Sequence, residues 1–144
     1  MKKLLLLPEL NITFFSFILN FVWEVLQTPF FIDKSFEINT IIWYRLHCTF
    51  GDVMISLVSF WLVALIFKSR QWFLHPIRVK LFLFIAFGIS YTIFSEIMNV
   101  STKNLWGYSD LMPVIPFLGV GIVPLIQWIV IPPVLVFIVR RQLS

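Results

Sequence analysis

Four apolar stretches, each long enough to cross a lipid bilayer and each holding at most one charged residue, constrain this chain more than any other feature. A helix needs about 20 apolar residues to span the hydrocarbon core. Only 12% of the residues are charged, against about 25% in a typical soluble domain. We therefore predict an all-α integral membrane protein with a single domain, residues 1–144, whose four transmembrane helices cover approximately residues 10–32, 46–67, 81–100 and 113–139.

The basic residues gather on one side of this topology. Most of them lie before the first span, between the second and third spans, or at the C-terminal end: Lys2, Lys3, Lys68, Arg70, Arg78, Lys80, Arg140 and Arg141. The cytoplasmic side of a membrane protein carries such an excess of positive charge. Both termini are therefore predicted to be cytoplasmic. No basic patch is left over, which argues against a nucleic-acid partner.

The fourth span is interrupted by proline and glycine. These residues are Pro113, Pro116, Gly119, Gly121, Pro124, Pro132 and Pro133. Proline removes a backbone donor and clashes with the preceding helical turn, so we predict a kinked or broken span. The stretch Pro113–Pro124 is either a re-entrant lid over the external end or part of an ordinary kinked helix, and the sequence leaves both open.

A short repeat links the first and third spans. Glu24-Val-Leu-Gln27 and Glu96-Ile-Met-Asn99 share a glutamate, two apolar residues and a side-chain amide. Two helical hairpins related by an axis along the membrane normal would give this parallel arrangement. A match of only four residues also arises by chance, so the sequence leaves open whether the two segments are a true repeat.

Three acidic residues lie within the apolar stretches. Glu24 and Glu96 fall in the last third of spans that run outward, and Asp52 falls in the first third of a span that runs inward. All three are therefore predicted in the outer half of the membrane, around one pocket. An ionisable residue inside a span is a functional candidate by default. We predict Glu24, Glu96 and Asp52 as catalytic acids and bases, because one desolvated carboxyl group can stay protonated while another is ionised.

Polar and aromatic residues accompany the three acids at helical spacing or in the adjoining external loop. The amides are expected to fix the geometry of a substrate, and the aromatic rings to stabilise a carbocation through their faces. The predicted substrate-binding residues are Asn20, Trp23, Gln27, Asn99, Trp106, Tyr108 and Gln127. The alternative is that these polar groups only hydrogen-bond the helices to one another.

His47 and Cys48 add two metal-ligating side chains near the acids. The sequence has neither the HxxxH nor the CxxC spacing of metal sites, so we predict no metal site and identify no cofactor. His47 is more simply read as an interfacial residue and Cys48 as a helix-packing residue.

Several strings resemble a family of short bacterial four-helix membrane proteins. They are Asn20–Glu24, Leu46–Asp52, Phe94–Glu96, Trp106–Tyr108 and the pattern from Met112 to Pro132. This resemblance covers nearly the whole chain. It implies the four-helix fold and the inner (plasma) membrane of a bacterium, and it implies no activity.

A second, local resemblance concerns mechanism. Asn20, Trp23 and Glu24 are similar to a string in integral-membrane terpene cyclases of the meroterpenoid type, which protonate an epoxide or olefin with intramembrane acids. Glu96 followed by Trp106 and Tyr108 resembles an element of membrane carotenoid cyclases and hydratases. This chain is much shorter than those enzymes. The resemblance implies acid chemistry at Glu24 and Glu96.

Three functions remain open. The favoured one is a membrane-embedded enzyme acting on an isoprenoid or other lipidic substrate, because the acids share one depth and the inner halves of spans one and three are apolar. The second is a small transporter of protons, metal ions or solutes, which would require a homo-oligomer. The third is an assembly partner of another membrane protein, with the acids paired to basic residues; within the chain only Arg45 and Lys103 are near enough to pair.

Overall fold

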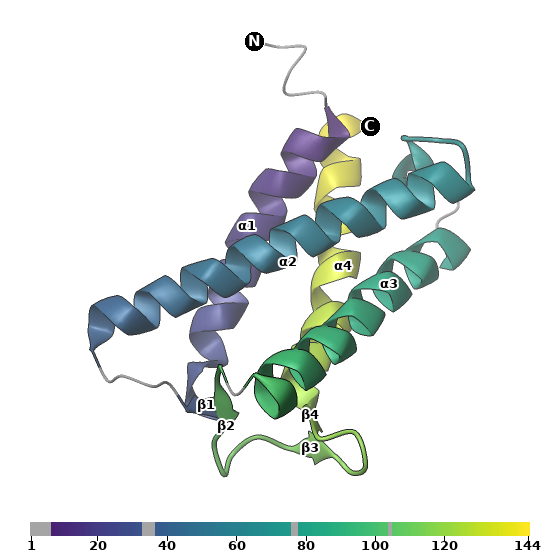
Figure 1. Cartoon of the computed structure of the whole chain (residues 1–144). Helices are drawn as coiled ribbons and strands as arrows, with labels where there is room; N and C mark the ends of the chain where they lie inside the picture. The colour runs from purple at the N-terminus through teal and green to yellow at the C-terminus, as the bar shows by residue number, and fades with distance from the viewer. Residues whose placement is uncertain (1–6, 33–36, 76–77, 104) are drawn as a thin grey trace.

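Four long helices, alternating in direction, make up most of the part of the chain that the structure describes (Figure 1). The computed structural model describes residues 7–32, 37–75, 78–103 and 105–144. The helices are α1 (Pro8–Leu26), α2 (Ile38–Ile66), α3 (Arg78–Glu96) and α4 (Ile122–Leu143). Within the described residues, all four are long and apolar enough to cross a membrane. The predicted four-helix membrane fold is therefore confirmed.

The two ends of the bundle differ. The start of α1 and the end of α4 lie together at one end, here called the termini end (Figure 1). The opposite end, here called the hairpin end, carries four short strands. The predicted cytoplasmic orientation of the termini end stays a prediction. Lys2 and Lys3, which contribute to it, lie outside the described residues.

The first span ends earlier than predicted. Helix α1 stops at Leu26 rather than near residue 32, and a 3₁₀ turn, η2 (Thr28–Phe30), and strand β1 (Phe31–Ile32) follow. The α conformation is disfavoured for the residue that precedes a proline, and Pro29 follows Thr28. The Thr28 hydroxyl donates to the Glu24 carbonyl oxygen at 3.1 Å, which satisfies one of the last helical carbonyl groups.

The second span begins earlier than predicted. Helix α2 starts at Ile38 rather than at residue 46, so Arg45 is helical and not part of a loop. Its 29 residues extend over roughly 43 Å at the usual rise of an α-helix. That length exceeds the hydrocarbon core of about 30 Å, so a spanning α2 either tilts or extends beyond the core. Figure 1 shows α2 crossing its neighbours obliquely.

The third span starts at Arg78, before the predicted residue 81, and continues beyond α3 as a π-helix, η4 (Ile97–Thr102). Single π-helical turns occur frequently at functional sites. The segment that leads into α3 contains a 3₁₀ turn, η3 (Trp72–Leu74), whose Trp72 and Phe73 are buried. Both residues lie between the second and third spans, and their side chains pack among the helices.

The fourth span was predicted too long. Residues 113–121 are not helical: β3 (Val114–Ile115) pairs antiparallel with β4 (Val120–Gly121). The turn between them has positive φ angles at Phe117 (73°) and Gly119 (66°). The predicted interruption is therefore confirmed, and it takes the form of a β-hairpin. The prediction that a helix begins at residue 113 is wrong, because α4 begins at Ile122. Helix α4 then runs through Pro132 and Pro133 without a break.

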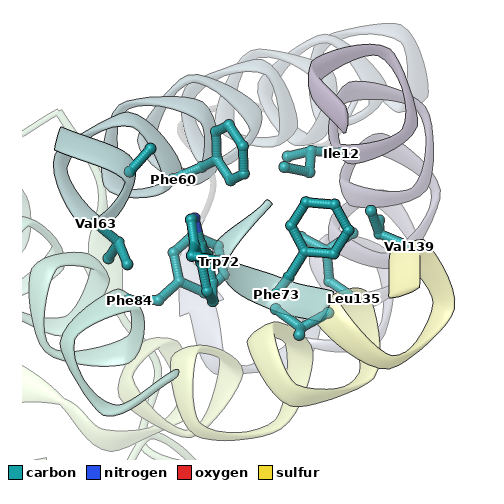
Figure 2. Close-up of a cluster of buried hydrophobic side chains, with 10 residues drawn as sticks. Ile12, Phe60, Val63, Trp72, Phe73, Phe84, Leu135 and Val139 are labelled. Carbon is teal, nitrogen blue, oxygen red and sulfur yellow. The ribbon is translucent and has the colours of Figure 1, made fainter. Parts of the chain in front are cut away.

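An aromatic core fills the termini end of the bundle (Figure 2). Phe60 of α2 is fully buried, and its ring centroid lies 5.9 Å from that of Trp72. Trp72 in turn lies 5.7 Å from Phe84 of α3. Leu135 and the end of α4 close the cluster. This half of the bundle is therefore packed with apolar side chains, and the buried acids lie towards the other end.

Candidate functional site

One cavity of about 240 Å³ lies between the helices, towards the hairpin end. All three predicted catalytic residues, Glu24, Asp52 and Glu96, line it. The sequence prediction that these acids surround one pocket is therefore confirmed as geometry, while their catalytic role stays a prediction. The other lining residues are Gln27, Phe31, Ile32, Tyr44, Arg45, His47, Cys48, Gly51, Ile55, Tyr91, Thr92, Ser95, Asn99, Leu105, Trp106, Pro124, Gln127 and Trp128.

Glu24 is held by two side chains. It lies in the last turn of α1, where Gln27 donates an amide N–H to its Oε1 at 2.6 Å. Arg45 of α2 places Nη1 at 3.7 Å from Glu24 Oε2, and both side chains are more than nine-tenths buried. Arg45 also stacks over the Phe31 ring at 5.6 Å. The sequence indicated Arg45 as a possible partner of an acid, and the structure confirms that pairing.

Asp52 connects three helices. Its carboxyl group lines the same cavity as that of Glu24. From α4, the Gln127 amide donates both of its N–H groups, one to Asp52 Oδ2 and one to Asn20 Oδ1, each at 2.8 Å. Gln127 therefore joins α4 to α2 through Asp52 and to α1 through Asn20.

A buried polar chain leads from Asn20 towards the middle of the bundle. Asn20 Nδ2 donates to Ser16 Oγ at 2.9 Å, and Ser16 donates to Ser56 Oγ at 3.0 Å. Beyond these serines lies the aromatic core of the termini end. Within the described residues, the polar chain therefore stops about half-way along the helices.

Glu96 is paired with Tyr108 by a small sheet. Strand β2 (Gly107–Tyr108) pairs antiparallel with β1, so that Tyr108 lies opposite Phe31. The Tyr108 hydroxyl donates a short hydrogen bond to Glu96 Oε2 and accepts one from the Gly121 amide at 3.0 Å. Burial, and then the neighbouring Glu96, raise the pKa of Tyr108 above its usual range. The phenol therefore keeps its proton and donates a hydrogen bond to the Glu96 carboxylate.

The predicted aromatic residues are placed differently from one another. Trp106 lines the cavity beside Glu96. Trp23 does not line it; its indole N–H donates to Gln27 Oε1 at 3.1 Å and so supports the amide that holds Glu24. This placement corrects the expectation that Trp23 presents its ring to a substrate. Asn20 likewise acts from behind the cavity wall through Gln127, whereas Asn99 lines the cavity.

His47 and Cys48 both line the cavity from α2. The described residues contain no group of three or more His, Cys, Asp or Glu side chains arranged to hold a metal ion. The three acids are instead engaged by Gln27, Arg45, Gln127 and Tyr108. These contacts suit proton transfer and hydrogen bonding.

Sequence reasoning missed Trp128 as a wall of the cavity. Its indole ring packs on Gly88 of α3, where a Cβ atom would lie only 1.9 Å from Trp128 Cε3. Both residues belong to apolar helix faces and gave no signal in the sequence. A glycine on one helix that faces a large ring on another would have identified them. Recognising such a pair requires knowing which helices pack together.

Gly88→Ala is expected to destabilise the protein by about 1–3 kcal/mol, as overpacking of a filled core does. The added methyl group must displace the Trp128 ring towards the cavity. Unfolding of the detergent-solubilised protein by SDS or heat measures the effect. Gly51→Ala is the matched control, because no atom lies within 4 Å of a Cβ atom at Gly51. Equal stability of the Gly88→Ala variant and the wild type would contradict the prediction.

No protein-family model, no curated protein and no solved structure matches this chain.

Proposed function

We propose that this protein is a membrane-embedded enzyme that performs acid–base chemistry on an isoprenoid or other lipidic substrate. The observation that carries this proposal is the convergence of three acids, each with different partners, on one cavity. Glu24 is paired with Arg45, Asp52 with the Gln127 amide, and Glu96 with a phenol. Such contrasting environments separate the proton affinities of neighbouring carboxyl groups, which is how enzymes assign acid and base roles.

In this proposal Asp52 delivers a proton and Glu96 removes one. A proton added to a carbon–carbon double bond or an epoxide leaves a cation, which the ring faces of Trp106 and Trp128 stabilise. Loss of a proton to Glu96, or attack by water, completes the reaction. Tyr108 positions the Glu96 carboxylate, and Gln127 positions Asp52. The site lies in the half of the bundle that the positive-inside pattern assigns to the outer leaflet.

The alternative of a conduit is less well supported. A pathway for protons or ions would require polar groups across both halves of the bundle, whereas Phe60, Trp72 and Phe84 fill the termini end. The alternative of an assembly partner is also weakened, because Glu24 is paired with Arg45 within the chain. Homo-oligomers and other membrane partners remain compatible with the enzyme proposal.

Mass spectrometry of molecules that co-purify with the protein in a mild membrane mimetic tests the function. We expect a specific isoprenoid or lipid with the wild-type protein, and its enrichment or chemical change in Glu96→Gln. Asp110→Asn is the matched control, because Asp110 is exposed and does not line the cavity. A bound metal ion that is lost in Glu96→Gln, without any specific lipid, would favour the ion-site alternative. A second membrane protein and nothing else would favour the assembly alternative.

A further inference from the structure

Gly51 forms a gap in the cavity wall at the middle of the bundle. It lies half-way along α2, is exposed, and lines the cavity. A Cβ atom at this position would meet no other atom within 4 Å. A glycine in the interior of a helix costs about 1 kcal/mol relative to alanine, and packing does not require one here. The missing side chain therefore leaves open space at this point of the cavity wall.

Helix α3 contributes a second exposed residue to the cavity wall. Tyr91 lies near the middle of the continuous helical segment 78–102, lines the cavity, and is 52% exposed. Figure 1 shows α2 and α3 diverging from their connection at the termini end towards the hairpin end. Gly51 of α2 and Tyr91 of α3 therefore border the same cavity, and both are exposed.

The depth of the opening decides whether it faces lipid chains or water. The middle of a spanning helix lies in the hydrocarbon core, where an exposed residue faces lipid chains rather than water. Met54 and Phe94, one turn away on the two helices, are each 60% exposed apolar residues, as expected for surfaces that face lipid. An opening at this depth is suited to an apolar chain and not to a polar solute arriving from water.

We propose that the substrate enters sideways from the bilayer, through a portal between α2 and α3 that is bordered by Gly51 and Tyr91. This inference rests on the proposed function and specifies it: the substrate is a single-chain lipid of the isoprenoid type whose chain passes the portal. Ile55 and Trp128 provide apolar contacts inside the cavity. Asp52, the residue directly after Gly51, meets the reactive end of the chain.

Photocrosslinking in phosphatidylglycerol–phosphatidylethanolamine vesicles tests the portal. The probe is a farnesol analogue that carries a diazirine, and adducts are mapped by mass spectrometry to the peptides around Cys48 and Trp128. We expect adducts in the wild type and in Gly51→Ala, and loss of these adducts in Gly51→Trp, whose indole fills the opening. Met54→Trp is the matched control, because Met54 faces outward from the same helix without lining the cavity.

The outcomes separate the portal from the chemistry. Cavity adducts that persist in Gly51→Trp would overturn the portal, and so would a cavity that only a water-soluble diazirine reaches. Gly51→Leu fills less of the opening and is expected to lose part of the labelling. It provides a second test of the portal if the tryptophan variant does not fold. Glu96→Gln should keep full labelling. If the wild type is labelled through the portal yet never converts a lipid, the portal stands and the acid–base function fails.

Discussion

Replacing Arg45 with glutamine is expected to lower the free energy of unfolding by about 3–5 kcal/mol, the usual effect of breaking a buried ion pair from one side. The guanidinium lies 3.7 Å from Glu24 Oε2, and both side chains are buried. Without Arg45, the Glu24 carboxylate would stay buried among protein groups and lipid but would lose its cationic partner. SDS titration of the protein in detergent measures the change.

Two matched variants decide whether the buried charge causes this effect. Glu24→Gln combined with Arg45→Gln should recover most of the lost stability, because no charge is then left unpaired and the new amide can still accept from Gln27. Arg70→Gln breaks a shorter ion pair, with 2.7 Å between Arg70 Nη2 and Glu9 Oε1, but Arg70 is 53% exposed. It should cost at most about 1 kcal/mol. Similar losses for Arg45→Gln and Arg70→Gln would contradict the assignment.

The second large effect concerns activity. Glu96→Gln is expected to reduce turnover of the lipid found by mass spectrometry by about 10²–10⁴-fold, the usual contribution of a general acid or base. The fold should persist, because the glutamine oxygen still accepts the hydrogen bond of the Tyr108 hydroxyl. Product formation in proteoliposomes measures turnover, and the melting temperature reports on the fold.

Tyr108→Phe distinguishes a catalytic from a positioning residue. It removes the donor to Glu96 and leaves the Gly121 N–H without its acceptor, which costs about 1–3 kcal/mol if that group stays buried. We expect a smaller loss of turnover than in Glu96→Gln, together with a changed pH profile. Asp110→Asn should change neither. An unaltered rate in Glu96→Gln would remove that residue from the mechanism.

The helices, and the acids within them, could be predicted because both depend on local properties of the chain. Bilayer thickness fixes the length of an apolar stretch, and the cost of burying a charge makes Glu24, Asp52 and Glu96 stand out within it. The helix ends were less well predicted. Whether residues near Pro29 or Pro113 continue a helix depends on alternative hydrogen-bond partners, here strands from distant parts of the chain.

By itself the sequence determined the four-helix membrane fold and singled out the three acids within it, because hydropathy and charge act without reference to partners. Only the tertiary structure decided which groups meet. It brought Arg45 to Glu24, carried Tyr108 to Glu96 through the pairing of β1 with β2, and joined Gln127 to Asp52 and Asn20. It also placed Gly51 of α2 and Tyr91 of α3 in the wall of one cavity. These contacts follow from how the helices tilt and pack, and neighbouring residues in the sequence do not specify that packing.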